Sequence, residues 1–311
     1  MAATEGSLAV PPGTNRLDTT TVNQTDGTEV HREAVVITDP EVLAARATVT
    51  NSTPAGTAYG QVVRHVPSDF MLDVAAGRVT GTTHVNKFGR NAAVVSGGTE
   101  EIWDGSAAYV FPATALMTSI SQTADQATMR GQVVEIQGLD ASWDAVTQNA
   151  TLNAANTTTV VTLTTALIRV FRMKVLADVV TDQDIRVHNA GETQDYAIIL
   201  AGNNQTLMAI YTVPNGKTAY MVSHYATVNP GGGQPGTLNV KMWAADRDNS
   251  YAKQLKHSLG VSADPDAYGR FQHFHSPYYK FTQKTDIYIT ATTSGAAADV
   301  SAGFDIILED N

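Results

Sequence analysis

Short segments in which apolar and polar residues alternate, separated by turn residues, recur from residue 81 to the end of the sequence. Leu238, Val240 and Met242 fall on one side of an extended chain, and polar residues stand between them. A repeat of two is the pattern of a β-strand with one buried face, whereas a helix repeats about every 3.6 residues. The same alternation marks the segments 171–175, 286–289 and 304–309. This pattern predicts an all-β fold for most of the chain.

Turn signals between these segments favour antiparallel connections. Asn215-Gly216 lies between two apolar runs, as in a tight hairpin, and Pro230 opens a run of three glycines before the next strand. We therefore predict an antiparallel β-sandwich or jelly-roll-like body over residues 81–311. The body is either one large sandwich or two smaller ones with a boundary near residue 200.

The N-terminal 80 residues have a different character. Residues 1–30 are polar, contain Pro11-Pro12-Gly13 and show no regular period, which predicts an extended arm that orders only on a neighbour. Residues 1–80 are thus expected to form an arm and an attachment module. The other residues of this module are predicted to form a small α/β region. Its strands are expected at 35–37, 58–66 and 70–74, and its helix from Asp39 to about Ala47.

The charge balance limits the partners of the chain. Charged residues make up 16% of the sequence, below the usual ~25%, and the net charge is −10. An acidic chain argues against nucleic acid, which attracts basic stripes, and no apolar stretch is long enough to cross a membrane. No secretory signal is expected either. A weakly charged sheet protein has little to keep its edges apart, so we predict a homo-oligomer, either a trimer or a pentamer.

No catalytic residue is predicted. The sequence has no cysteine, which excludes disulfides, thiolate metal sites and a cysteine nucleophile. It also lacks the serine-hydrolase elbow, the phosphate-binding loop and the His-Glu-x-x-His motif. We therefore expect no enzymatic activity and no cofactor.

Two weak patterns bear on metal binding. His273 and His275 lie two residues apart, so on a strand they face the same side and could share a metal ion. Asp246 and Asp248 resemble the start of a calcium loop, but the glycine and glutamate that an EF-hand needs are missing. An exposed aromatic strand and a polar turn are the favoured explanations of these residues, because no third ligand is identified. The prediction is therefore no metal.

Five residues are candidates for subunit or partner contacts. Trp103 either anchors a subunit interface or caps the end of the core. Val35 and Ile37 form a short apolar run in the attachment module, and Tyr278 and Tyr279 close a tyrosine-rich segment.

A set of motifs carries a family resemblance. The segments Asp26–Ile37 and Pro54–Arg64 resemble the N-terminal module of virion structural proteins of tailed bacteriophages. The body is similar to a protein common in phages of marine bacteria, through residues 86–91, 101–105, 137–140, 168–173 and 208–220. Together these motifs span the chain from about residue 26 to its end. The resemblance implies a location in the virion and implies no catalytic residues.

Two roles in the virion follow from this resemblance. The first is a capsid-associated decoration, vertex or head-fibre component, whose partners are the major capsid protein or other virion proteins. The alternative is a tail fibre or spike that binds a receptor on the host surface. An enzyme such as a depolymerase is the least favoured class, since nothing beyond scattered carboxylates supports it.

Overall fold

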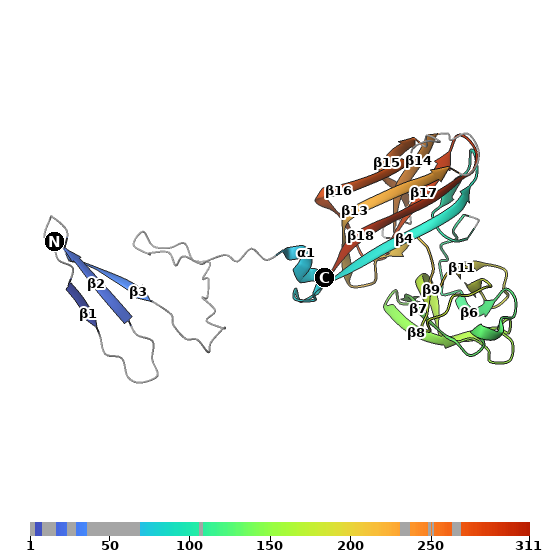
Figure 1. The fold of residues 1–311 in the computed structure, drawn as a ribbon, viewed down its shortest axis with the longest axis horizontal. Helices are drawn as coiled ribbons and strands as arrows, with labels where there is room; N and C mark the ends of the chain where they lie inside the picture. The colour runs from blue at the N-terminus through green and yellow to red at the C-terminus, as the bar shows by residue number, and fades with distance from the viewer. Residues whose placement is uncertain are drawn as a thin grey trace. The chain divides into compact units, whose positions relative to one another are not determined.

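The structure is a computed structural model of the whole chain. It describes residues 4–7, 17–23, 29–35, 69–105, 108–230, 237–247, 250, 252–262 and 269–311. The chain divides into two compact units, Met1–Pro67 and Ser68–Asn311, which we call the N-terminal unit and the body (Figure 1).

The N-terminal unit contains a three-stranded antiparallel sheet in the order β1-β2-β3. Its strands are β1 (Thr4–Ser7), β2 (Leu17–Asn23) and β3 (Glu29–Val35). Strands β1 and β2 lie within residues 1–30, where the sequence shows no regular period. Strand β2 carries three consecutive threonines and a valine, and β-branched residues favour extended chain even where no alternation is visible.

Most of the elements expected in the attachment module fall on residues that the structure does not describe. Val35 is the last residue of β3. Ile37, the helix expected from Asp39 and the strand expected at 58–66 lie outside the residues that the structure describes.

Residues 70–74, predicted as a strand, belong instead to helix α1 (Phe70–Ala75). The side chain of Asp69 accepts hydrogen bonds from the backbone N–H groups of Met71 and Leu72, which is the pattern of an N-cap. This local cap outweighs the strand preference of phenylalanine and valine. No helix in the described parts of the chain is long and apolar enough to cross a membrane.

The rest of the body is built from strands and one short 3₁₀ helix. Its elements are β4 (Thr82–Val94), β5 (Thr99–Glu101), β6 (Met117–Gln122), η1 (Ala127–Met129), β7 (Val133–Asp140), β8 (Ala145–Thr151), β9 (Val161–Val175), β10 (Ile185–His188), β11 (Asp195–Ile199), β12 (Ile210–Thr212), β13 (Lys217–Pro230), β14 (Thr237–Asp246), β15 (Ala252–Ser262), β16 (Gly269–Phe281), β17 (Thr285–Thr293) and β18 (Ala298–Asp310).

Two of the body's sheets pack face to face as a sandwich. The four-stranded sheet has the order β16-β13-β18-β4, and the five-stranded sheet has the order β12-β17-β14-β15 with β5 added beside β17. Both contribute to one apolar core, with Phe304 and Met221 from the first and Val240 and Ile289 from the second. All pairs between these strands are antiparallel, so the predicted all-β antiparallel sandwich is confirmed.

The strands between β6 and β11 form a separate group within the body (Figure 1). They make a six-stranded sheet in the order β11-β10-β6-β9-β7-β8, with its own apolar core. Tyr288 of β17 belongs to this second core, while its neighbours Ile287 and Ile289 belong to the first. Strand β17 is therefore buried on both faces and forms a wall that the two cores share.

A buried ion pair crosses from the six-stranded sheet to this wall. Arg169 of β9 is 2% exposed and Asp286 of β17 is 1% exposed. Nε and Nη2 of the arginine donate to the two carboxylate oxygens, over 2.8 and 2.9 Å. Thr212 donates a further hydrogen bond to the same carboxylate, and Nη1 donates to the backbone oxygen of Pro112. Each member of the ion pair thus makes a further hydrogen bond to a neighbouring group.

Strand β4 approaches the backbone of the neighbouring chain segments closely at Gly89. A β-carbon at this position would overlap the backbone nitrogen of Ala209 and the backbone oxygen of Ile102, which are hydrogen-bonded to each other. Only a residue without a side chain allows this approach.

Candidate functional site

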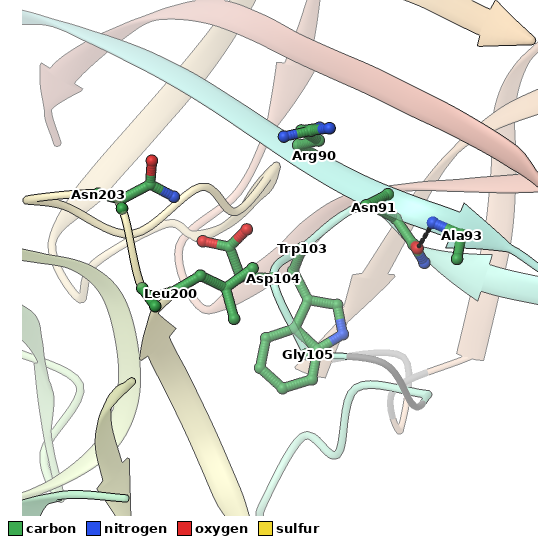
Figure 2. A pocket seen from close by; sticks show the side chains of 11 residues that line it. Arg90, Asn91, Ala93, Trp103, Asp104, Gly105, Leu200 and Asn203 are labelled. Carbon is green, nitrogen blue, oxygen red and sulfur yellow. Dashed lines mark hydrogen bonds between the residues drawn. The ribbon is translucent and has the colours of Figure 1, made fainter. Parts of the chain in front are cut away.

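The body contains a cleft of about 320 Å³, close to the lower size limit of small-molecule sites. Three segments form it: residues 90–93 of β4, residues 103–105 after β5, and residues 200–203 after β11. Figure 2 shows the carboxylate of Asp104 between Asn203 and the strand that carries Arg90 and Asn91. The cleft therefore lies where the chain passes from the sandwich to the six-stranded sheet.

Trp103 fixes one side of this cleft. Its side chain is 4% exposed and belongs to the second core, where its ring meets the edge of Tyr109 at a centre distance of 5.1 Å. A β-carbon on Gly105 would overlap the Trp103 ring, so the glycine lets the loop fold over it. Of the two roles considered for Trp103, the structure places it in the core.

Asp104 is held by backbone hydrogen bonds to Leu207. The backbone N–H of Leu207 donates to the carboxylate over 3.0 Å, and the backbone N–H of Asp104 donates to the oxygen of Leu207 over 3.0 Å. Burial raises the pKa of the Asp104 carboxyl to about 7, although the Leu207 hydrogen bond and the charge of Arg90 oppose the change. The side chain is therefore partly protonated at neutral pH.

Two other polar side chains of the cleft are already paired. Arg90 donates to both carboxylate oxygens of Asp299, over 2.9 and 2.6 Å, and Asn91 donates to Glu100 over 2.9 Å. None of the described residues that line the cleft is a serine, cysteine or histidine. The geometry suits hydrogen bonding to a polar ligand or to a partner's loop, and it contains no nucleophile with an adjacent base.

Replacing Asp104 by asparagine is expected to change how the stability of the body depends on pH. The folded carboxyl holds its proton up to about pH 7, while the unfolded one loses it near 3.8, so wild-type stability falls as the pH rises between these values. Asparagine keeps the acceptor for Leu207 and cannot ionise. Urea unfolding of both proteins should therefore show a stability difference that grows in favour of Asp104→Asn from about pH 4 to about pH 7 and is constant above it. A difference that does not change with pH would contradict the raised pKa.

The histidines singled out from the sequence lie in a larger group. His273 and His275 face the interior of the sandwich from β16, with ring centres 4.7 Å apart. His224 of β13 and His257 of β15 lie beside them, and we call these four residues the histidine cluster. The six distances between the ring centres run from 4.5 to 6.2 Å.

Burial lowers the pKa of three members of the histidine cluster. Burial first, and the neighbouring histidines second, lower the pKa of His224 to about 3 and that of His275 to about 4, and they lower the pKa of His257 as well. Nδ1 of His224 and Nε2 of His275 share a hydrogen bond of 3.1 Å. Nε2 of His224 and Nδ1 of His257 are buried and have no hydrogen-bond partner among the described residues.

Sequence reasoning missed His224 and His257 because they come from other strands. His224 directly faces His273 across the β13–β16 ladder, and β15 meets β16 at the edge of the sandwich. The one available signal was the position of His224, which stands in line with the inward-facing Ala226 and Val228. A histidine at a core position of a strand is expected to have a hydrogen-bond partner in the core.

Of the remaining candidates, Tyr279 packs its ring against that of His275, with ring centres 5.8 Å apart. Asp246 ends β14 and accepts a hydrogen bond from Thr282 over 3.2 Å, and Asp248 lies outside the described residues. Tyr278 and Tyr279 are exposed on β16, with 44% and 40% of their surface accessible. Across the described ranges, no group of three or more His, Cys, Asp or Glu side chains could hold a metal ion in the arrangement that the structure shows.

No family model and no curated protein matches this chain. Among solved structures, one of the infectious bursal disease virus Gt strain has 9% identity over 78% of each chain and a TM-score of 0.22. A structure of T=1 particles derived from infectious bursal virus has 9% identity over 74% of each chain and a TM-score of 0.19. Likenesses this weak establish neither a common fold nor a common function.

Proposed function

We propose that this chain is a structural protein of a bacteriophage virion, held on the capsid through its N-terminal unit as a decoration, vertex or head-fibre component. The observation that carries the proposal is the division of the chain into a β body and a separate N-terminal unit with a single small sheet. The resemblance of residue 26 onward to virion structural proteins of tailed phages supports the same role.

The N-terminal sheet has the properties of an attachment element. Among the described strands, β1 and β3 each pair only with β2, so both outer edges offer unpaired backbone groups. The described residues of the N-terminal unit supply no second layer for either face of this sheet. A lone three-stranded sheet gains stability when a partner adds a strand or covers a face, and a capsid protein is the partner that we propose.

The body favours self-assembly for a related reason. Its three sheets end in the outer strands β4, β16, β12, β5, β15, β8 and β11, and only 16% of the chain's residues are charged. Closed symmetry is the common way to cover such edges, so we propose a homo-oligomer, a trimer or a pentamer. Sedimentation of the purified chain tests this, and a stable monomer at micromolar concentration would contradict it.

Deleting residues 1–67 is expected to abolish incorporation into the virion. The body keeps its sheets and both cores in this variant, since they lie within Ser68–Asn311. Purified full-length and shortened proteins are incubated with particles that lack the protein, and the amount that sediments with the particles is measured. A thermal unfolding curve with a single transition shows that the shortened protein is folded. Equal incorporation of the two proteins would contradict attachment through the N-terminal unit.

A tail fibre or spike is the second candidate, and strand β16 favours it. Phe274, Tyr278 and Tyr279 are 65%, 44% and 40% exposed on this outer strand. Exposed aromatic rings on one strand are typical of surfaces that bind a partner. Gold labelling of intact virions separates the two roles, because a decoration protein labels the head and a fibre labels the tail. If the tail is labelled, Phe274→Ser with Tyr278→Ser should reduce adsorption to host cells.

A further inference from the structure

We propose that the histidine cluster is a binding site for one first-row transition-metal ion, Zn²⁺ by preference, coordinated by His224, His257, His273 and His275. This inference does not depend on the proposed role in the virion. The four residues are half of the eight histidines in the chain, and they come from three strands.

The spacing of the four rings matches a tetrahedral site. A ligating imidazole nitrogen lies about 2.0–2.1 Å from Zn²⁺, and its ring centre lies about 1.1 Å further out. Four such rings around one ion therefore have centres about 5.2 Å from one another. The six observed distances, 4.5 to 6.2 Å, scatter around this value.

The nitrogen atoms are partly in place. Nδ1 of His224 and Nε2 of His275 lie 3.1 Å apart, and two ligand nitrogens of a tetrahedral zinc site are separated by about 3.3 Å. In the arrangement that the structure shows, the four rings do not form a group that could hold a metal ion, and His257 and His273 are stacked at 22°. Binding therefore requires the rings to turn about their side-chain bonds while the strands stay where they are.

Two nitrogen atoms of the cluster lack a hydrogen-bond partner in the interior. Neutral imidazole is the form of histidine that binds transition metals. His224 is 1% exposed, yet its Nε2 has no hydrogen-bond partner among the described residues. Nδ1 of His257 is also buried and also lacks a partner among them. A buried polar atom without a partner is costly, and a metal ion supplies what the surrounding core does not.

The histidine cluster lies between the two sheets of the sandwich, so a bound ion would connect them. His257 belongs to the five-stranded sheet, whereas the other three histidines belong to the four-stranded sheet. Both β15 and β16 are outer strands of their sheets. An ion held by all four residues would tie the two sheets together along one open side of the sandwich, in a chain that has no disulfides.

The test uses the full-length chain without a histidine tag, stripped with a chelator and titrated with Zn²⁺ or Co²⁺. We expect one ion per chain by calorimetry, and the intense visible absorption of tetrahedral Co²⁺. At a hundredfold excess over Kd, Zn²⁺ should raise the melting temperature by about 5–10 °C. Mg²⁺ and Ca²⁺, which prefer oxygen ligands, should have no effect.

Two variants and one control separate this site from adventitious binding. His273→Gln and His257→Gln replace the two less buried members of the cluster and should each weaken Zn²⁺ binding by at least about tenfold. His84→Gln, on the exposed part of β4, should bind as the wild type does. The proposal is overturned if Zn²⁺ and Co²⁺ fail to bind, if Co²⁺ shows only the weak absorption of an octahedral ion, or if both cluster variants bind like the wild type.

Discussion

Replacing Arg169 by methionine is expected to lower the free energy of unfolding of the body by about 3–5 kcal/mol, because the change leaves Asp286 charged and unpaired in the interior. The carboxylate is 1% exposed and loses two hydrogen bonds from the arginine. Among the described residues, Thr212 would remain as its side-chain donor. Urea unfolding followed by tryptophan fluorescence measures the loss.

Two further variants show whether the loss comes from the unpaired charge. The double variant Arg169→Met with Asp286→Leu removes both charges and should recover more than half of the stability. Arg78→Met breaks an ion pair to Asp73 on the surface, where the arginine is 58% exposed, and should cost less than about 1 kcal/mol. If the double variant were as unstable as the single one, packing rather than the buried charge would explain the result.

Gly89→Ala is expected to destabilise the body by about 3 kcal/mol or more, the upper part of the range for overpacked interiors. The added carbon would meet backbone atoms of Ala209 and Ile102, which cannot turn aside as the end of a side chain can. Relief requires β4 to move away from both segments, and this disturbs its pairing with β18. Thermal unfolding measures the effect.

Gly260→Ala is the matched control, since it makes the same chemical change in an exposed strand. No atom lies within 4 Å of a β-carbon placed at Gly260, so the substitution should be neutral or slightly stabilising. Equal stability of the Gly89 and Gly260 variants would show that β4 has room to move.

The strands of the sandwich could be predicted from the sequence because their burial follows a local period. Leu238, Val240 and Met242 are all buried, as their alternation indicates. The same reasoning expected Asp286 to be on a polar face, and this was wrong. Its strand is covered on both sides, and the arginine that neutralises it lies 117 residues earlier. A period of two cannot reveal a partner at that distance.

The histidine cluster also depends on contacts between strands that are distant in the sequence. His273 and His275 could be paired from their spacing, since two residues on one strand share a face. Placing His224 and His257 beside them requires the register of β13 against β16 and the meeting of two sheets. Helix α1 was missed for a local reason, because its cap at Asp69 outweighs the apolar residues that suggested a strand.

The shared wall formed by β17 has a consequence for the time course of synthesis. A ribosome adds about 5–20 residues per second, so a growing chain carries Arg169 for roughly 6–23 s before Asp286 exists. During that interval the six-stranded sheet lacks the wall that covers its core. The four-stranded sheet is completed later still, because β4 pairs with β18, which is the last strand to be synthesised. Neither half of the body can mature while its partner strands are still untranslated, and both become stable together at the end of synthesis.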